Sequence, residues 1–387
     1  MNYYSEILKI IDGGIRGDVQ KVVDYSLLLA DKLNKSGDDR KAQRIRSTVE
    51  KQGYITDKDI LSLAQNKSVN YPRQIPFDQE SKLELANIFL PNQLRNKKLI
   101  LSYETLAQIE EFIKAYQNYD DLVAHNLEIP TTMLLFGPPG CGKTETAFSI
   151  ARRLDLPIVV ARLDTMISSY LGSTAKNIRF LFDYAKKNQC VLFLDEFDAV
   201  AKLRDDIHEM GELKRVVNSL LQNIDTLDNR SVLIAATNHE KLLDPAIWRR
   251  FSTRINISLP NSQLILEVIN ELLLETDSAL DNKSVEFLIL LFKGQAIADI
   301  QQIIKRAIRK TILDKRKLEL PDVVESYFDY TQIIIETEPE SIRNSKLEYL
   351  FNVKSDLSYR LLGEILRLHH KTAKKLADKI NEVKGVK

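Results

Sequence analysis

Residues 137–144 have the composition and spacing of a loop that binds a chain of phosphates. They read Gly-Pro-Pro-Gly-Cys-Gly-Lys-Thr, which matches the pattern G-x-x-x-x-G-K-[ST]. Glycines let backbone N–H groups turn toward phosphate oxygens, and a helix starting here adds unpaired donors and the positive end of its dipole. The Lys143 ammonium can reach the β and γ phosphates of a nucleotide, and the Thr144 hydroxyl can ligate Mg²⁺.

A loop of this kind needs a strand before it and a helix after it, and the sequence predicts both. The apolar run 133–136 indicates a buried strand, and residues 145–154 have helical periodicity. A glycine turn that binds nothing is the alternative, which is disfavoured because the other motifs of a nucleotidase follow in the expected order. We expect nucleotide contacts from Gly137, Pro138, Pro139, Gly140, Cys141, Gly142, Lys143, Thr144 and Glu145.

A second run of apolar residues, about 50 residues after the phosphate loop, ends in two carboxylates. Residues 189–196 read Gln-Cys-Val-Leu-Phe-Leu-Asp-Glu, which predicts a strand with acidic residues at its carboxyl end. Asp195 can hold Mg²⁺ through water, so that Thr144 and Asp195 are the expected metal ligands. Glu196 can polarise a water next to the γ phosphate. The chemistry expected is hydrolysis of ATP.

The segment 168–179 resembles a motif of a known protein family. It reads Ser-Ser-Tyr-Leu-Gly-Ser-Thr-Ala-Lys-Asn-Ile-Arg, an aromatic–aliphatic–glycine triplet before a helix, and here the chain resembles an AAA ATPase. The resemblance implies that Tyr170 and Leu171 form a pore loop that grips a threaded polypeptide by contact area. The family more often has Val where Leu171 stands, and the alternative is that Tyr170 is an ordinary buried aromatic. A second channel loop is expected at 204–211.

Three further polar residues match positions of that family. Residues 232–238 read Val-Leu-Ile-Ala-Ala-Thr-Asn, and the resemblance makes Asn238 the sensor that orients the lytic water. It also makes Arg249 and Arg250 arginine fingers that act on a neighbouring subunit's nucleotide; the alternative is a surface basic pair. Contiguous arginines resemble the branch that contains the katanin, spastin and endosomal-sorting ATPases. Fingers acting in trans imply an oligomer, and the family leads us to expect a hexamer.

Residues 262–328 carry four helical patterns, which fits the small helical lid of an AAA module. Within them, the segment 294–300 corresponds to the family's second sensor, with Ile297 where the family normally has Ser or Gly. The resemblance implies that Gly294 and Ala298 lie near the adenine and ribose and contact them through the backbone. This branch lacks a sensor arginine at that place.

The fold class predicted is α/β: a P-loop NTPase with a parallel sheet, helices on both faces, a small helical lid and an additional N-terminal helical bundle. By size and position the bundle resembles the microtubule-interacting-and-trafficking adaptors, and the alternative is a helical cap with no partner. We expect the bundle over residues 1–52, a linker over 53–97, the large α/β subdomain over 98–260, the lid over 261–330 and a C-terminal helical extension over 331–387.

The end of the C-terminal extension is basic. Residues 358–387 hold eight Lys/Arg against three Asp/Glu, a local charge of 8 − 3 = +5. The pattern resembles a helix-turn-helix only faintly, and the charge could favour phosphates or an acidic protein surface. The alternative is a helical tail that supports the lid.

Composition narrows the classes of function. The formal charge of +1 gives no reason to expect nucleic acid or a membrane surface as partner. Only two cysteines occur, which indicates no structural disulfide and a cytoplasmic, reducing location. The start of the sequence does not resemble a signal peptide, and no apolar run approaches the ~18 residues that span a bilayer.

These observations predict an ATP-driven motor that remodels or unfolds proteins as a ring, a stand-alone member of bacterial type. Its partners would be copies of itself, a protein substrate, and an adaptor or a separate protease. An intrinsic zinc protease is not expected because H-E-x-x-H does not occur, and the serine motif G-x-S-x-G is also not found in the sequence. The alternatives are a nucleic-acid-associated ATPase switch and a signalling scaffold.

Overall fold

The computed structural model of the chain consists of two compact units, residues 1–74 and 75–387. The first contains α2 (Val19–Lys35), whose side chains Ala30 and Leu33 pack with Ala42. Much of the bundle predicted over 1–52 lies outside the described residues and stays a prediction. The structure describes residues 7, 9, 19–35, 41–45, 84–94, 96–163, 171–199, 210–227, 230–243, 245–274, 276–334, 338–354 and 357–384.

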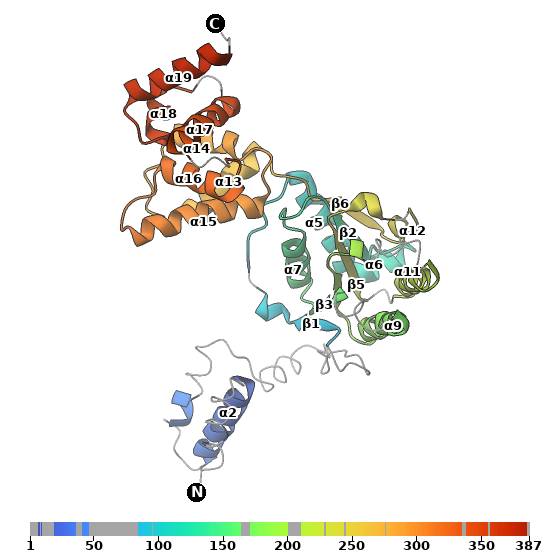
Figure 1. The fold of residues 1–387 in the computed structure, drawn as a ribbon. Coiled ribbons are helices and arrows are strands. Elements are labelled where there is room, and N and C mark those ends of the chain that lie inside the picture. Colours follow the sequence, from blue (N-terminus) through green and yellow to red (C-terminus); the bar gives the residue numbers. More distant parts are fainter. Residues whose placement is uncertain are drawn as a thin grey trace. The chain divides into compact units, whose positions relative to one another are not determined.

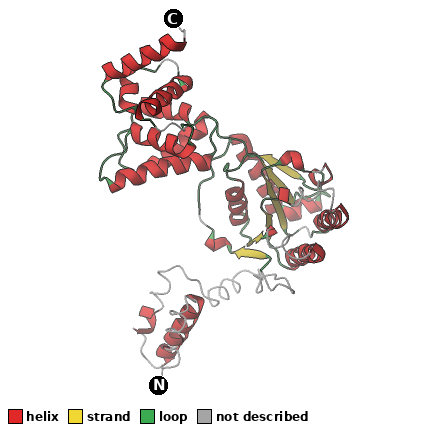
Figure 2. Ribbon diagram, in the orientation of Figure 1, coloured by secondary structure: helices red, strands yellow, loops and turns green. Residues whose placement is uncertain are grey.

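A six-stranded sheet forms the centre of the α/β part of the second unit, in the order β1-β3-β4-β5-β2-β6 (Figures 1 and 2). Neighbouring strands pair in parallel, except that β1 pairs antiparallel with β3 at one edge. Because β2, β4 and β5 are parallel neighbours, the residues that follow them meet at one edge of the sheet. The strands are β1 (Ala86–Phe89), β2 (Thr132–Phe136), β3 (Ile158–Ala161), β4 (Val191–Leu194), β5 (Val232–Thr237) and β6 (Thr253–Asn256).

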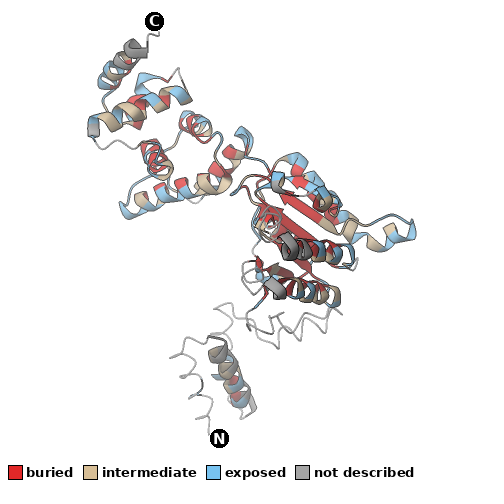
Figure 3. Cartoon of the chain, turned by 45° about the vertical axis from the view of Figure 1, so that its right-hand side comes forward, coloured by how far each residue is buried: buried red, intermediate tan, exposed pale blue. Residues whose placement is uncertain are grey.

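Both faces of the sheet are covered, and the side chains of its central strands are buried (Figure 3). Along β2, Leu134 belongs to a core that includes side chains of α9 (Leu171–Lys187) and α11 (Met210–Asp225). Met133 and Leu135 belong to the opposite core, with side chains of α5 (Tyr103–Gln117) and α7 (Lys143–Arg153). This alternation is the period of two that an extended strand imposes. The predicted α/β class with helices on both faces is confirmed.

The helical part of the second unit contains the four helices predicted for the lid and three more. Asn261 and Asp281 cap two of them, because their side chains accept hydrogen bonds from the backbone N–H groups of Leu264 and Ser284. The helices are α13 (Ser262–Leu273), α14 (Asn282–Leu291), α15 (Ile297–Leu313), α16 (Leu320–Thr331), α17 (Pro339–Val353), α18 (Tyr359–Ile365) and α19 (His370–Lys384).

The lid and the C-terminal extension share one hydrophobic core. Leu350, Leu362 and Ala373 from the extension belong to the same buried cluster as Phe287 and Ile304 from the lid. The extension is therefore packed on the lid, as the supporting-tail alternative predicts.

A buried carboxylate, Asp322 at the start of α16, joins the two parts electrostatically. Its oxygens accept from both terminal nitrogens of Arg316, at 2.6 and 2.9 Å, and from the Arg367 guanidinium, at 2.6 Å. Arg367 follows α18 and has a φ of +52°, in the left-handed region that usually favours glycine. The ion pair with Asp322 gives a reason for arginine at this position.

The strand β1 lies inside the segment predicted to be a linker. Ala86 pairs with Ala161 and Phe89 with Ile158, so residues 86–89 extend the sheet. The α/β part therefore begins before residue 98. None of the helices in the described part of the chain has the length and apolarity needed to span a membrane. The remaining short elements are η1 (Pro91–Gln93), α6 (Tyr119–Ala124), η2 (Glu240–Leu242) and α12 (Pro245–Trp248).

Candidate active site

The phosphate loop lies between β2 and α7, as the motif predicts. Gly137 has a φ of +136°, and a Cβ there would lie 2.2 Å from the backbone oxygen of Ile257. Gly140 has a φ of +73°, and its Cβ would approach the side chains of Ala296 and Ala298 to 3.1 and 3.2 Å. At Gly137 only glycine fits both the backbone conformation and the space, whereas at Gly140 it is chiefly the positive φ that favours glycine.

The lysine of the motif is folded against the loop. Lys143 is buried, and its Nζ donates to the backbone oxygens of Gly137, at 2.8 Å, and Pro138, at 2.7 Å. Burial lowers the pKa of Lys143 from its ordinary value. The ammonium is thus held beside the loop by carbonyl oxygens.

Thr144 and Asp195 come from different elements and meet directly. The Thr144 hydroxyl, in the first turn of α7, donates to Oδ2 of Asp195, which follows β4, at 2.9 Å. The other carboxylate oxygen, Oδ1, accepts from the backbone N–H of Glu196 at 2.9 Å. A hydroxyl and a carboxylate are ligands suited to Mg²⁺, which usually takes few protein ligands beside water and phosphate oxygens. The donor set therefore fits a nucleotide-bound magnesium ion.

Glu196 is turned away from the strand that precedes it. Its φ of +50° places the residue in the left-handed region, which is unusual for a non-glycine side chain. The side chain is exposed, and it lines the same cavity as Lys143 and Thr144. A carboxylate in this place can accept a proton from a water molecule bound in the cavity.

A network under the sheet edge positions Asn238. The Thr237 hydroxyl donates to Oδ1 of the buried Asp198 at 3.1 Å and accepts from the backbone N–H of His239 at 3.0 Å. Asp198 lies two residues after Glu196, so this network links the turn after β4 to the turn after β5. Asn238 lies between Thr237 and His239 in the sequence and lines the same cavity as Asp195 and Glu196.

One cavity of about 340 Å³ collects these groups, and its size lies in the usual range for ligand pockets. The start of α15 closes one side of it, because the Ala298 N–H donates to the Gly140 oxygen at 3.0 Å. The residues that line the cavity are Lys97, Pro139, Gly140, Gly142, Lys143, Thr144, Glu145, Asp195, Glu196, Asn238, Ile297, Ala298 and Gln301.

A second, smaller pocket of about 50 Å³ shares five of its residues with this cavity, and it is more apolar. Ile100, Leu101 and Cys141 contribute to its lining, together with Ile297 from the lid. This apolar pocket therefore lies directly beside the phosphate loop. Cys141 and Cys190 are both free and buried.

The two candidate arginine fingers lie elsewhere, just after α12. Arg249 is exposed. Arg250 forms an ion pair with Asp225, at the end of α11, with 2.6 Å between Nε and Oδ1. Trp248 packs edge-on against Phe136 with 5.1 Å between ring centroids, which ties this turn to the end of β2. Neither arginine is among the residues that line the cavity of its own subunit.

Comparison with known proteins identifies the family. The family model described as "ATPase family associated with various cellular activities (AAA)" matches residues 133–259. An AAA family ATPase of Sinorhizobium fredii is 39% identical over 247 residues, which are 63% of this chain and 72% of that protein. The chain belongs to the AAA ATPase family. As a member it binds ATP and hydrolyses it to ADP and phosphate.

Other relatives of this AAA ATPase are more distant. The proteasome-activating nucleotidase of Saccharolobus solfataricus is 32% identical over 242 residues, which are 58% of this chain and 61% of that protein. A crystal structure of the FIGL-1 AAA domain is similar in fold, with a TM-score of 0.54 and 23% identity. That similarity covers 70% of this chain and 95% of the FIGL-1 chain. The ATPase thus spans less than two thirds of the nucleotidase.

The structure brings together most of the residues that the sequence predicts for the ATP site, with clear exceptions. Gly294 has a φ of +85° before α15 but is not among the cavity-lining residues. Tyr170 and most of the segment 204–211 lie outside the described residues, and so does the side chain of Leu171, the first residue of α9.

Sequence reasoning missed Lys97 and Gln301 as lining residues. Gln301 is detectable because it lies four residues after Ile297 on the same helical face. Lys97 precedes the first predicted helix of the α/β part and carries no local signal.

Proposed function

We propose that this AAA ATPase is a motor that remodels or unfolds proteins as a ring of identical subunits, with six as the expected number. One observation carries the proposal. The cavity is lined by Lys143, the carboxylates of Asp195 and Glu196 and the amide of Asn238, all from one subunit. The candidate fingers Arg249 and Arg250 are not among its lining residues. A guanidinium supplied by a neighbour would complete the site, as in other nucleotidases that receive an arginine in trans.

Within one subunit, we assign binding to the loop and orientation to the strand ends. Gly140, Gly142 and the start of α7 would bind the phosphates through backbone N–H groups, and Lys143 would exchange its carbonyl partners for phosphate oxygens. Thr144 and Asp195 would hold Mg²⁺, which supplies charge stabilisation when bound. Glu196 would take the proton of the attacking water, and the Asn238 amide would orient that water.

Between subunits, the two arginines would have different roles. Arg249 is exposed, and its side chain has no ion pair among the described residues, so it can reach a neighbour's γ phosphate. Arg250 is held by Asp225 within its own subunit. We assign Arg249 as the main arginine finger. Arg250 could act as a finger only after its ion pair with Asp225 is broken. A transferred guanidinium accelerates related reactions by about 10³–10⁵.

Substrate handling is assigned to the segment before α9. Leu171 is the first residue of this helix, and Tyr170 precedes it in the sequence. Side chains of α9 share a hydrophobic core with those of β4, the strand that leads to Asp195 and Glu196. Movement of α9 during hydrolysis would carry the pore loop along a bound polypeptide. The N-terminal bundle is proposed as an adaptor that binds a partner.

A second candidate function is ATP-driven delivery of substrates to a separate protease. It is favoured by one observation, the 32% identity to a protein named as a proteasome-activating nucleotidase. The chain carries neither protease motif itself. Stimulated degradation of an unfolded substrate by a co-expressed peptidase would distinguish this role from stand-alone remodelling.

Mixing two inactive variants tests the shared site. Glu196→Gln keeps its arginines but loses its catalytic carboxylate, and Arg249→Ala keeps its carboxylate but loses its finger. An equal mixture should regain about a quarter of the parental ATPase rate, because random assembly of a heterologous ring completes that share of interfaces.

The control is a mixture of Glu196→Gln with Lys143→Ala, which are defective in the same half of the site and should restore nothing. If co-assembled Glu196→Gln and Arg249→Ala subunits also restore nothing, the finger does not act in trans.

A further inference from the structure

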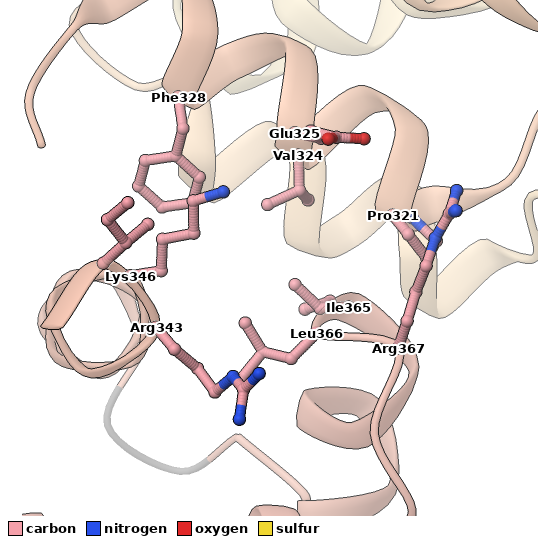
Figure 4. Close-up of a pocket in the computed structure, with 10 residues that line it drawn as sticks. Pro321, Val324, Glu325, Phe328, Arg343, Lys346, Ile365, Leu366 and Arg367 are labelled. Carbon is pink, nitrogen blue, oxygen red and sulfur yellow. The ribbon is translucent and has the colours of Figure 1, made fainter. Parts of the chain in front are cut away.

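A second large cavity lies in the C-terminal part of the chain, away from the nucleotide site. It has a volume of about 380 Å³ and opens between α16, α17 and the end of α18 (Figure 4). The lining residues are Pro321, Val324, Glu325, Phe328, Ile342, Arg343, Lys346, Ile365, Leu366 and Arg367. None of them lines the ATP cavity.

The floor of this C-terminal cavity is apolar. Val324 and Phe328 of α16 and Ile365 of α18 are buried in the core shared by lid and extension, and Leu366 is half-buried beside them. Figure 4 shows the Phe328 ring on one side of the open space and the side chains of Ile365 and Leu366 on another. Apolar groups that line an open space lose their contacts with other atoms unless a ligand fills it.

The rim of the cavity is charged, and two of its charges are already paired. Arg367 binds Asp322, and Glu325 lies 3.7 Å from the Lys310 ammonium. The remaining cations are Arg343 and Lys346, which are three residues apart on α17 and therefore lie on the same side of that helix. The Lys346 Nζ is 5.4 Å from the centre of the Phe328 ring.

Arg343 is exposed and forms no ion pair with any of the described residues. The rim therefore presents two cations above an apolar floor, and Glu325, the acidic residue among those that line the cavity, is paired with Lys310. A ligand that fits both parts must carry an apolar group and a negative charge close together. The local charge of +5 over residues 358–387 adds attraction for an acidic partner.

We propose that this cavity binds a short segment of a partner protein in which a large apolar side chain is flanked by carboxylates. The apolar side chain would fill the space between Phe328, Val324 and Ile365, and the carboxylates would pair with Arg343 and Lys346. Peptide docking into a groove between helices uses such anchors, with charges at the edge that select the partner. The site needs neither a ring nor a pore, so it stands independently of the proposed motor.

A random peptide library displayed on phage, panned against the full-length chain, tests this proposal. The expected result is enrichment of peptides with Leu, Ile or Phe between Asp or Glu residues. A synthetic, fluorescein-labelled copy of the most enriched peptide then gives a dissociation constant by fluorescence anisotropy. The double variant Arg343→Glu/Lys346→Glu should weaken that binding at least about tenfold, because it places like charges opposite the peptide.

The matched control is Arg360→Glu/Lys375→Glu, which changes the net charge of the same region equally at exposed residues outside the cavity. It should bind the peptide as the parent does. Both double variants should keep the parental circular dichroism spectrum and basal ATPase rate, which separates loss of the site from loss of the fold.

Five results would overturn the proposal. Enriched peptides without carboxylates, or no enrichment at all, would contradict the chemistry. Equal binding by the Arg343→Glu/Lys346→Glu variant would place the peptide elsewhere. Displacement of the peptide by decanoate at lower concentration than by the unlabelled peptide would assign the cavity to a small amphipathic acid. Self-association that the same variant abolishes, without peptide binding, would assign it to a second copy of this chain.

Discussion

The nucleotide site and the C-terminal cavity are built in different ways. The nucleotide site depends on main chain: glycines with positive φ, the start of α7, and residues placed directly after β4 and β5. The C-terminal cavity is formed by side chains of three helices, and Asp322 helps to hold those helices together. A backbone-built site leaves a contiguous motif in the sequence, whereas a side-chain-built cavity leaves scattered residues.

The largest effect is expected from a substitution in the nucleotide site that removes a catalytic group and keeps the fold. Glu196→Gln should slow ATP turnover by about 10²–10⁴, because the general base is lost, while ATP binding is kept. Steady-state phosphate release and equilibrium binding of a fluorescent ATP analogue measure the two properties. Glu110→Gln, which changes a half-buried carboxylate of α5 that pairs with Arg153, is the control and should leave both unchanged. A parental rate in Glu196→Gln would remove Glu196 from the mechanism.

A second substitution tests whether the loop depends on glycine backbone. Gly137→Ala should destabilise the fold by about 3–4 kcal/mol, because its Cβ would overlap the Ile257 oxygen at 2.2 Å. Gly142→Ala should cost only about 1–2 kcal/mol, since its φ is +103° but no atom lies within 4 Å of the added Cβ. Urea unfolding followed by circular dichroism measures both. Equal losses would show that conformation alone, and not the close approach of β6, demands the first glycine.

The third prediction concerns the carboxylate that joins lid and extension. Asp322→Asn should lower the free energy of unfolding by about 2–3 kcal/mol, below the usual cost for a fully buried pair because both arginines are partly exposed. Asp329→Asn, whose exposed carboxylate pairs with Arg306, should cost less than about 1 kcal/mol. Urea titration of both variants tests the difference, and equal small losses would show that Asp322 does not hold the two parts together.

The pH dependence of stability sharpens the same prediction. Burial alone would raise the pKa of Asp322, but the hydrogen bonds and charges of Arg316, the Glu319 N–H and Arg367 outweigh it and hold that pKa below its ordinary value. The ionised carboxylate therefore stabilises the fold above its unfolded-state pKa, and this contribution is lost as the pH falls through the lower folded-state pKa. The difference in stability between parent and Asp322→Asn should shrink below about pH 4. A difference that stays constant to lower pH would contradict this linkage.

Much of the site could be predicted from sequence because its parts are local. The phosphate loop, the Asp195–Glu196 pair and the lid helices follow from short motifs and from helical periodicity, and each has the predicted place in the structure. The strand β1 could not be predicted, since the four residues from Ala86 to Phe89 are too few to show a period, and their pairing with β3 spans about 70 residues of sequence.

By itself, the sequence determined that this chain is an AAA ATPase and predicted most of the residues that line the candidate nucleotide cavity, because backbone-built sites are specified by neighbours along the chain. Only the tertiary structure showed that Arg249 and Arg250 have different environments, because Asp225 of α11 forms an ion pair with Arg250. It also decided that the extension shares the core of the lid and leaves a cavity between α16, α17 and α18. Such features arise from side chains far apart in sequence, whose contacts no local pattern records.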